Sequence, residues 1–312
     1  MSKRVLLLAV PIGAGHIAAA RAVESALNNL DANIQTRFVN AFDWTLPEYG
    51  KVYRLFYEYS VRHNQDVLES LYDSNVLKRI NVDFLPFAHR VLIYHFPRLI
   101  KEYQPQIIIS THFSPTYCAI LLKRMFRFTL LVTVTDYHIH PFWFNPDIDF
   151  YIVAHDDLIP QLEKFGVDRS KILPYGIPIN PRFEKAVAKK NLREKLNLSP
   201  DRVTVLVIGG KICGGKWVEI VRELMDFDIE LIAVCGANKY LRRKIERLKG
   251  KASLSTLGLV DNLHEYIQSS DFLITKAGGI STTEAMVSGA TMILANSLPL
   301  SLIHISEPTR PY

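Results

Sequence analysis

Short strand-like runs alternate with helix-like segments along the whole chain, and this alternation restricts the fold more than any other feature of the sequence. The runs suit strands buried on both faces of a sheet, and the segments between them are long enough for crossover helices. We therefore predict an α/β fold with two parallel, doubly wound sheets, one in each half of the chain. The expected strands are 5–10, 35–39, 107–110, 129–135 and 150–153 in the first half, and 204–208, 230–234, 253–256, 272–275 and 291–294 in the second.

A length of 312 residues and a hydrophobic fraction of 48% are sufficient for two packed domains. The prolines and the glycine of residues 173–181 are typical of a hinge. We therefore assign residues 1–178 to the first domain and 179–300 to the second, with a ligand expected in the cleft at the carboxyl ends of the strands. Beyond 291–294 the chain does not continue the helix and strand alternation. Residues 301–312 are accordingly interpreted as a non-native tail, and the second domain as truncated.

The charge and cysteine content restrict the partners and the compartment. Lys and Arg outnumber Asp and Glu by 37 to 31, which favours an anionic partner such as a nucleotide, a nucleic acid or an acidic membrane surface. The three cysteines have no metal-ligand spacing, which favours a reducing, cytoplasmic setting. The apolar run 5–10 is too short for a secretory signal, and no run is long enough to span a bilayer, so we expect any membrane contact to be peripheral.

Residues 270–284 are the best candidate for a diphosphate site. A short apolar strand leads through Gly278 and Gly279 into a helix expected to open near Ser281. Glycines allow close approach of the backbone, and the N–H groups at a helix N-terminus attract anions. Glu284, one turn further, is placed to bind ribose hydroxyls. The competing interpretation is a capping box, in which Ser281 and Glu284 satisfy only the helix's own N–H groups.

Two further segments carry candidate catalytic groups in the first half. Pro-Ile-Gly-Ala-Gly-His at residues 11–16 places His16 at a helix N-terminus, where the dipole favours a neutral imidazole that can act as a general base. The alternative is a turn-capping histidine without a catalytic role. In residues 133–143, Asp136 is expected to orient a histidine or an acceptor hydroxyl, and Trp143 and Phe142 to offer an apolar wall. His138 and His140 lack a third metal ligand.

The presence of one glycine motif and the absence of two others bear on the class of reaction. Gly209 and Gly210 follow the first strand of the second half and are expected to contact the same diphosphate. Neither the Gly-x-Gly-x-x-Gly dinucleotide fingerprint after the first strand nor the Walker lysine motif is present. Both absences argue against hydride transfer and against nucleoside triphosphate hydrolysis.

Residues 49–103 form a long helical insertion rich in aromatic and basic side chains. Amphipathic helices of this composition lie at lipid interfaces, where aromatic rings enter the headgroup boundary and Arg meets anionic lipid. The competing interpretation is that the aromatic residues pack on the sheet. The residues concerned include Tyr53, Arg54, Phe56, Tyr57, Tyr59, Arg62, Phe84, Phe87, Arg90, Tyr94, Phe96 and Arg98.

In their order along the chain, these segments resemble the diacylglycerol glycosyltransferase family, which includes monogalactosyldiacylglycerol synthase and processive diacylglycerol beta-glucosyltransferase. The resemblance covers residues 4–295. Its motifs are Gly-x-Gly-His at 13–16, Thr-His-Phe-Ser at 111–114, Val-Thr-Asp at 134–136 with His-Pro-x-Trp at 140–143, Tyr-Gly-Ile-Pro at 175–178, Gly-Gly at 209–210, Gly-Leu-Val at 258–260, Thr-Lys-Ala-Gly at 275–278 and Glu-Ala-Met at 284–286.

The resemblance implies a GT-B fold of two Rossmann-like domains and an inverting hexosyltransferase without a metal or other cofactor. A UDP-hexose would be the donor and diacylglycerol or a glycolipid the acceptor, at the inner, anionic face of the cell membrane; no nucleic-acid partner is expected, and the resemblance favours the lipid interpretation of the insertion. The implied catalytic residues are His16 and Asp136. The implied donor-binding residues are Gly209, Gly210, Val260, Lys276, Gly278, Gly279, Ile280, Ser281 and Glu284, and the acceptor-binding residues are Gly15, His112, His140 and Trp143.

The chain departs from the family pattern at two points. Asn180 stands where relatives carry an arginine near the uracil, and the Gly-Gln-Glu segment expected after Leu298 and Pro299 is missing, which bears on whether the chain is active. Three alternatives remain: a peptidoglycan-precursor N-acetylglucosaminyltransferase, a UDP-N-acetylglucosamine 2-epimerase on the same fold, and a non-catalytic membrane-binding remnant.

Overall fold

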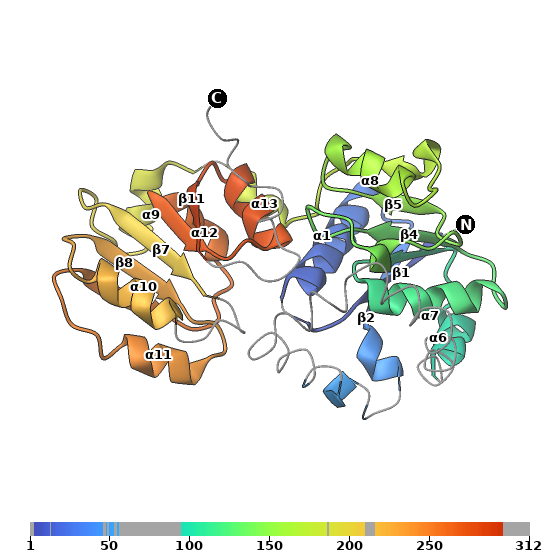
Figure 1. The fold of residues 1–312 in the computed structure, drawn as a ribbon, viewed down its shortest axis with the longest axis horizontal. Helices are drawn as coiled ribbons and strands as arrows, with labels where there is room; N and C mark the ends of the chain where they lie inside the picture. Colours follow the sequence, from blue (N-terminus) through green and yellow to red (C-terminus); the bar gives the residue numbers. More distant parts are fainter. Residues whose placement is uncertain are drawn as a thin grey trace. The chain divides into compact units, whose positions relative to one another are not determined.

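The computed structural model describes residues 3–12, 14–45, 48, 50–52, 55, 95–185, 187–209 and 216–295. The described chain divides into two compact units, with the boundary between Asn180 and Pro181 (Figure 1). Gly13, Gly210, most of the predicted insertion and the predicted tail lie outside the described residues.

Unit 1 is built on a six-stranded parallel sheet with the strand order β2-β1-β3-β4-β5-β6 (Figure 1). Its strands are β1 (Lys3–Ala9), β2 (Ile34–Asn40), β3 (Ile107–Ser110), β4 (Thr129–Thr133), β5 (Phe150–Ile152) and β6 (Ile172–Leu173). Its described α-helices are α1 (Gly15–Leu30), α6 (Phe96–Tyr103), α7 (Phe113–Lys123) and α8 (Ile159–Glu163).

The apolar run of β1 supplies both faces of this sheet. Successive side chains of a strand point to opposite faces, so Leu6 and Leu8 enter one core, while Val5 and Leu7 enter another. The first core is completed by apolar residues of α6 and α7, and the second by residues of α1. Burial on both faces is the condition that an uninterrupted apolar strand predicts.

Unit 2 contains a five-stranded parallel sheet with the order β11-β10-β7-β8-β9. Its strands are β7 (Thr204–Ile208), β8 (Glu230–Val234), β9 (Ser253–Leu257), β10 (Phe272–Thr275) and β11 (Thr291–Leu294). Its described helices are α9 (Lys189–Lys195), α10 (Lys216–Leu224), α11 (Lys239–Ile245), α12 (Leu263–Ser269) and α13 (Gly279–Val287).

Each sheet contains one point where the strand order reverses. In unit 1 the chain runs from β1 outward to β2 and then returns to β3 on the other side of β1. In unit 2 it runs from β7 through β8 to β9 and then returns to β10 on the other side of β7. At such a reversal the loops at the carboxyl ends separate in opposite directions and leave a crevice, where doubly wound folds bind ligands.

The predicted α/β class and its two parallel sheets are confirmed, and all ten predicted strands are present with ends shifted by at most two residues. The strand β6 (Ile172–Leu173), at the start of the predicted hinge, was not expected. The lipid-facing interpretation is wrong for Phe96, which is buried in the first core of unit 1. Arg98, two residues on, is exposed and pairs with Glu102.

Asp271 connects three parts of unit 2. Its carboxylate contacts Arg193 and Lys189 of α9 at 2.5 and 2.9 Å, and it accepts a hydrogen bond from the Thr204 N–H at the start of β7. The guanidinium of Arg193 is almost fully buried and donates its other hydrogen bonds to backbone carbonyls. A buried guanidinium that loses its carboxylate keeps the cost of desolvation without the compensating attraction.

We expect Asp271→Asn to lower the free energy of unfolding by about 2 kcal/mol, because it leaves Arg193 without its counter-charge. Denaturant-induced unfolding measures the difference. The matched control is Glu102→Gln, which removes an exposed Arg98 pair of similar length and is expected to change the free energy of unfolding much less. Equal losses in the two variants would contradict the assigned role of Asp271.

Candidate active site

His16 lies at the strand-order reversal of unit 1. α1 begins at Gly15 immediately after the β1 loop, so His16 is the second residue of the helix and is partly exposed. Its Nδ1 lies 2.9 Å from the carbonyl oxygen of Thr111, which directly follows β3. The Thr111 hydroxyl in turn donates to the His16 carbonyl at 2.8 Å. Two hydrogen bonds therefore join the loops that follow β1 and β3, across the crevice between them.

These contacts determine the tautomer of His16. A carbonyl oxygen only accepts hydrogen bonds, so the proton of a neutral imidazole must reside on Nδ1, and Nε2 then carries the lone pair. The hydroxyl of Thr135 lies 2.9 Å from the same Nδ1 and holds the ring from a third strand end, that of β4. The turn-capping interpretation is wrong, because α1 has no side-chain cap and His16 bonds to a residue 95 positions away.

His112 packs behind His16 and is 3% exposed. Its Nδ1 accepts the N–H of Ser114 at 3.0 Å and thereby caps α7. Its ring meets the His16 ring edge to face, with 4.6 Å between the centroids. Burial, with smaller contributions from His16 and His140, holds the pKa of His112 well below its usual range. At neutral pH His112 is therefore an uncharged support for the His16 ring.

Asp136, Trp143 and His140 form a second group at the end of β4. The indole N–H of Trp143 donates to the Asp136 carboxylate at 3.0 Å, and His140 Nε2 lies 3.8 Å from the same oxygen. The Asp136 side chain is 31% exposed, yet the burial of its carboxyl raises its pKa to about 6. Burial lowers the pKa of His140 to about 3. Near pH 7 the group thus consists mainly of a carboxylate held by an indole and a neutral imidazole.

The predicted acceptor residues differ in how far their side chains or backbone are exposed to solvent. Gly15 opens α1 and is partly exposed, whereas His112, His140 and Trp143 are at least 95% buried. Their contact with an acceptor stays a prediction, but Trp143 is not the open apolar wall that we expected: its indole holds Asp136. Phe142, the other expected wall residue, is partly exposed and stacks on the partly exposed Phe113, with 5.1 Å between the ring centroids.

Sequence reasoning missed Phe113 as a wall residue, although it lies inside the Thr-His-Phe-Ser motif. It also missed Thr135, which lies next to Asp136 in the Thr-Asp motif. Phe113 directly follows His112, and Thr135 directly precedes Asp136, both of which were predicted site residues. Membership of the same motif was therefore the signal that could have identified them.

In unit 2 the helix α13 begins at Gly279, two residues earlier than expected, and Gly278 caps it without a side-chain hydrogen bond. The Thr282 N–H bonds to the Gly278 carbonyl at 3.0 Å, whereas the three preceding N–H groups have no partner within the described chain. The capping-box interpretation is wrong, because Ser281 lies inside the first turn and is not the cap.

Gly278 and Gly209 differ in whether packing within the fold requires a glycine. A Cβ atom at Gly278 would meet only the Lys276 side chain, at an ordinary 3.6 Å, so the folded chain itself does not demand glycine there. At Gly209 a Cβ atom would lie 3.1 Å from the Trp217 ring, so close packing already explains that glycine. Gly209 directly follows β7 and Gly278 follows β10, and both flank the reversal of strand order in unit 2.

Glu284 faces the interior one turn into α13. It is 8% exposed, and within the described residues no hydrogen bond or ion pair holds its carboxyl. Burial raises its pKa to about 7. Thr282 beside it has a buried hydroxyl without a described partner, a feature that the sequence did not indicate. Two buried polar groups without a described partner near an open helix N-terminus are groups whose hydrogen bonds a polar ligand can supply.

The remaining predicted residues of unit 2 surround this helix start or lie further along the sheet. Lys276 and Ser281 are partly exposed and Ile280 is buried. Val260 follows β9, which is separated from β7 by β8. Gly210 lies outside the described residues. No helix in the described part of the chain combines the length and the apolarity that crossing a bilayer requires.

Comparison with family models relates both units to glycosyltransferases. The monogalactosyldiacylglycerol (MGDG) synthase model matches residues 16–179, and the glycosyltransferase family 28 C-terminal domain model matches residues 204–296. A processive diacylglycerol beta-glucosyltransferase of Bacillus licheniformis is 28% identical over 96% of this chain and 78% of its own length. The protein of the same name from Bacillus subtilis is 29% identical with the same coverage.

Solved structures with a similar fold share little sequence with this chain. MurG of Acinetobacter baumannii has a TM-score of 0.55 at 14% identity, covering 94% of this chain and 77% of its own. A UDP-GlcNAc 2-epimerase of Neisseria meningitidis, bound to UDP-GlcNAc, has a TM-score of 0.57 at 10% identity, covering 94% and 82%. At this identity the likeness shows the fold, which is GT-B with two Rossmann-like domains, as predicted.

The family model spans more than half of the chain, and the motif residues of the β1–β3 crevice lie inside or at the edge of the matched range. The chain therefore belongs to the monogalactosyldiacylglycerol synthase family of glycosyltransferases.

Proposed function

We propose that this protein transfers a hexose from a UDP-sugar to diacylglycerol, or to a glycosyl-diacylglycerol, with inversion at the anomeric carbon. The observation that carries the proposal is the 2.9 Å contact between His16 Nδ1 and the Thr111 carbonyl oxygen, from which we infer that the proton lies on Nδ1 and the basic lone pair on Nε2. Membership of the family and the names of the curated relatives support diacylglycerol as the acceptor.

In the proposed reaction Nε2 of His16 accepts the proton of the acceptor hydroxyl. The alkoxide oxygen forms the new bond to the anomeric carbon as the bond from that carbon to the UDP oxygen breaks, and the electron pair leaves with UDP. The imidazolium that forms is held through its Nδ1–H by the Thr111 carbonyl and Thr135, so the ring need not reorient during the proton transfer. Asp136, whose carboxylate accepts the Trp143 indole N–H, is the second residue that we assign to the reaction, with the role of orienting the acceptor hydroxyl.

The donor side of the proposal rests on α13. The departing UDP gains negative charge, and the open N–H groups of Gly279, Ile280 and Ser281 offer preorganised donors to its phosphates. Glu284 lacks a partner within the described residues, and ribose hydroxyls can supply the hydrogen bonds that its carboxyl requires. Gly278, Gly279, Lys276 and Gly209, with Val260 at the uracil, complete the proposed donor site. The proposed location is the cytoplasmic face of the membrane, where both substrates are available.

The two alternative enzymes on this fold receive less support. The solved structures of MurG and of the 2-epimerase show a common fold at 14% identity or less, which does not carry a substrate. The family match and the curated relatives both point instead to diacylglycerol. Acceptor assays with diacylglycerol and with a polyprenyl-linked precursor distinguish the transferases.

We expect His16→Ala to reduce turnover by at least about a hundredfold, because the variant lacks the general base, and to leave the affinity for UDP unchanged. Turnover is measured with UDP-glucose and with UDP-galactose on diacylglycerol in detergent micelles, and UDP affinity by calorimetry. His155→Ala, which changes another partly exposed histidine of unit 1, is the control. Unchanged turnover in His16→Ala would remove this residue from the mechanism.

Thr135→Val is expected to reduce kcat by about fivefold to tenfold with little change in KM for the UDP-sugar. The variant loses one of the two groups on His16 Nδ1, a hydrogen bond worth about 1 kcal/mol. Thr135→Ser keeps the hydroxyl and should restore most of kcat. A loss that serine does not restore would mean that Thr135 acts by packing alone.

Glu284→Gln is expected to stabilise the folded chain at pH 8 but not at pH 4.5. Below its ordinary value of 4.5 the carboxyl is neutral in the folded and unfolded chains alike. As the pH rises, the unfolded chain ionises first, so stability is lost until the folded pKa of about 7 is passed, by a total of about 3 kcal/mol.

Thermal unfolding at the two pH values tests the Glu284 prediction. Glutamine carries no charge and therefore avoids the loss. Glu223→Gln, an exposed glutamate of the same unit, should show no such pH dependence. A difference between Glu284→Gln and the parent chain that is the same at pH 4.5 and pH 8 would contradict the assigned burial of the Glu284 carboxylate.

A further inference from the structure

The excess positive charge of the chain is concentrated in one short segment of unit 2, residues 239–251, which we call the basic segment. It contains seven Lys and Arg residues and a single acidic residue, Glu246. The whole chain contains 37 basic and 31 acidic residues, so its formal net charge of +6 equals that of the basic segment. All other residues together are balanced. The seven basic residues are Lys239, Arg242, Arg243, Lys244, Arg247, Lys249 and Lys251.

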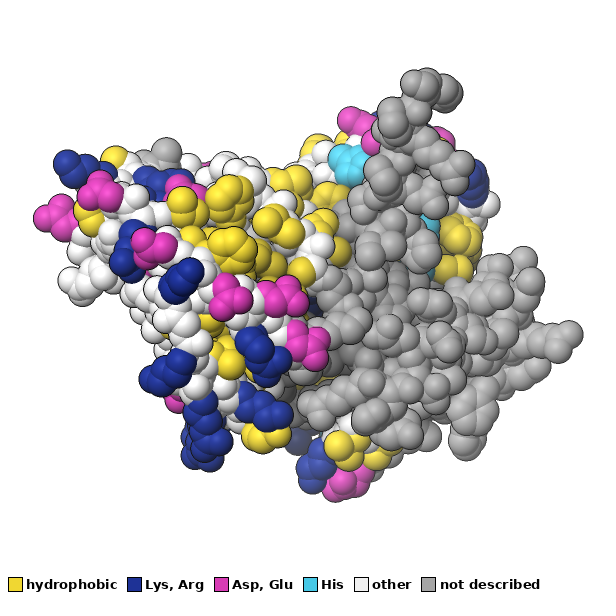
Figure 2. All heavy atoms as spheres, turned by 60° about the vertical axis from the view of Figure 1, so that its left-hand side comes forward, with side chains coloured by type: hydrophobic (Ala, Val, Ile, Leu, Met, Phe, Trp, Pro, Cys, Tyr) yellow, Lys and Arg dark blue, Asp and Glu magenta, His cyan; other side chains and the backbone are white. Residues whose placement is uncertain are grey.

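The basic segment presents these charges to solvent. It comprises α11 and the turn that follows, and all seven basic residues are exposed. Leu241 and Ile245 are buried and fasten the helix to unit 2, while Lys239 and Arg243, four positions apart, occupy the outer face. Figure 2 shows Lys and Arg side chains gathered on the lower part of unit 2, where α11 lies in Figure 1.

Few of these charges are neutralised within the described chain. Arg242 pairs with Glu246 at 2.7 Å, and the Lys244 ammonium lies 4.6 Å from the centre of the Tyr240 ring. The other five basic residues form no ion pair with a described residue. An uncompensated row of like charges lowers the stability of the free chain through repulsion, and an anionic partner removes that repulsion.

Exposed apolar side chains accompany the charges. Tyr240 in the first turn of α11 is 69% exposed and Leu259 is 82% exposed. Leu259 lies beside the loop that leads into α11, because a Cβ atom at Gly236 would be 3.9 Å from its Cδ2. The adjacent Gly258 lies beside Arg242 in the same way. An aromatic ring and an aliphatic side chain beside basic residues match the boundary between headgroups and acyl chains of a bilayer.

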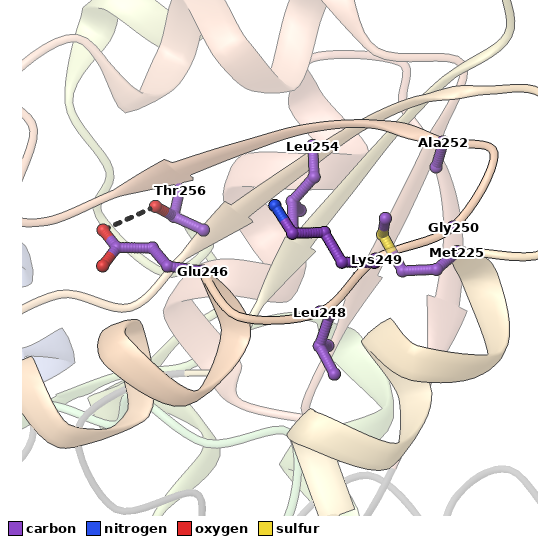
Figure 3. Close-up of a pocket in the computed structure, with 8 residues that line it drawn as sticks. All are labelled: Met225, Glu246, Leu248, Lys249, Gly250, Ala252, Leu254 and Thr256. Atoms are coloured by element: carbon purple, nitrogen blue, oxygen red, sulfur yellow. Dashed lines mark hydrogen bonds between the residues drawn. The ribbon is translucent and has the colours of Figure 1, made fainter.

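The other end of the basic segment borders a shallow hollow of about 270 Å³ (Figure 3). Met225, Leu248 and Leu254 contribute apolar surface to it, and Lys249 extends along it. Glu246 at its far side is already held by Arg242 and by the Thr256 hydroxyl. None of the predicted donor or acceptor residues lines this hollow. The basic segment is therefore separate in its residues from the sites described above.

We propose that the basic segment binds the anionic headgroups of a phospholipid bilayer. Charges spread along thirteen residues, with apolar side chains at one end, fit an extended anionic surface better than a single small anion. The proposal rests on the proposed function to the extent that a lipid acceptor gives the protein a reason to be at a membrane. It assigns a membrane contact to unit 2; the contact that the sequence predicted for the insertion falls mostly outside the described residues.

The test is sedimentation with vesicles of phosphatidylcholine or of phosphatidylglycerol, at low and at high salt. The parent chain should bind phosphatidylglycerol vesicles at low salt and release them at high salt. The quadruple variant Lys239→Gln, Arg243→Gln, Arg247→Gln and Lys249→Gln should bind them at least about a hundredfold more weakly, since each basic residue near such a surface contributes about fivefold.

The matched control removes the same charge from other exposed positions: Arg124→Gln, Arg127→Gln, Lys164→Gln and Lys190→Gln. It should retain most of the vesicle binding. Equal loss in the two quadruple variants would overturn the proposal, because net charge alone would then account for binding. Binding of the parent chain to a structured RNA, lost in the first variant, with no binding to vesicles would also overturn it in favour of a nucleic-acid surface.

Turnover in detergent micelles separates this proposal from the proposed function. The first quadruple variant should retain parental turnover on diacylglycerol in micelles, because none of its four residues belongs to the donor or acceptor site. A parent chain without transferase activity in micelles would contradict the proposed function, and the vesicle experiment would still decide the role of the basic segment.

Discussion

The hydrogen bonds between His16 and Thr111 are the interaction on which the proposed chemistry depends. They span the place where the strand order of unit 1 reverses, so they connect two loops that the sheet itself directs apart. Because the bond partner of Nδ1 is a backbone carbonyl, the tautomer does not rely on a titrating neighbour. The buried neutral rings of His112 and His140 surround this arrangement without competing for its proton.

The corresponding reversal in unit 2 is built in a different way. There the crevice is bordered by a glycine at the end of β7 and by a helix that starts with its backbone N–H groups open. Side chains contribute little to it except Glu284, whose buried carboxyl is costly to the chain alone. In the proposed reaction the first crevice holds the His16 side chain for proton transfer, and the second offers backbone N–H groups to the charged donor. One topological feature serves two kinds of chemistry.

The sequence predicted the sheets well because a strand buried on both faces is a local, unbroken apolar run, as in β1 and β7. It did not predict β6, which is two residues long and pairs only with β5. The start of α13 was placed two residues late because serine is a common helix cap, whereas here glycine occupies that position. The motifs located His16, Asp136 and Glu284, but not their surroundings. The His16 to Thr111 contact joins residues 95 positions apart, and the burial of Trp143 follows from packing among several strands, which no local pattern records.

In the proposed contact with a bilayer, the concentration of the net charge in residues 239–251 also orients the approach of unit 2. At physiological ionic strength the field of an exposed charge decays over about 8 Å, so the attraction acts only during the last step of approach. Within that range the force is exerted on one side of unit 2, and it therefore produces a torque as well as a pull. Encounters that begin in other orientations are turned towards α11 or dissociate, and the orientation on the surface is selected before any lipid is engaged.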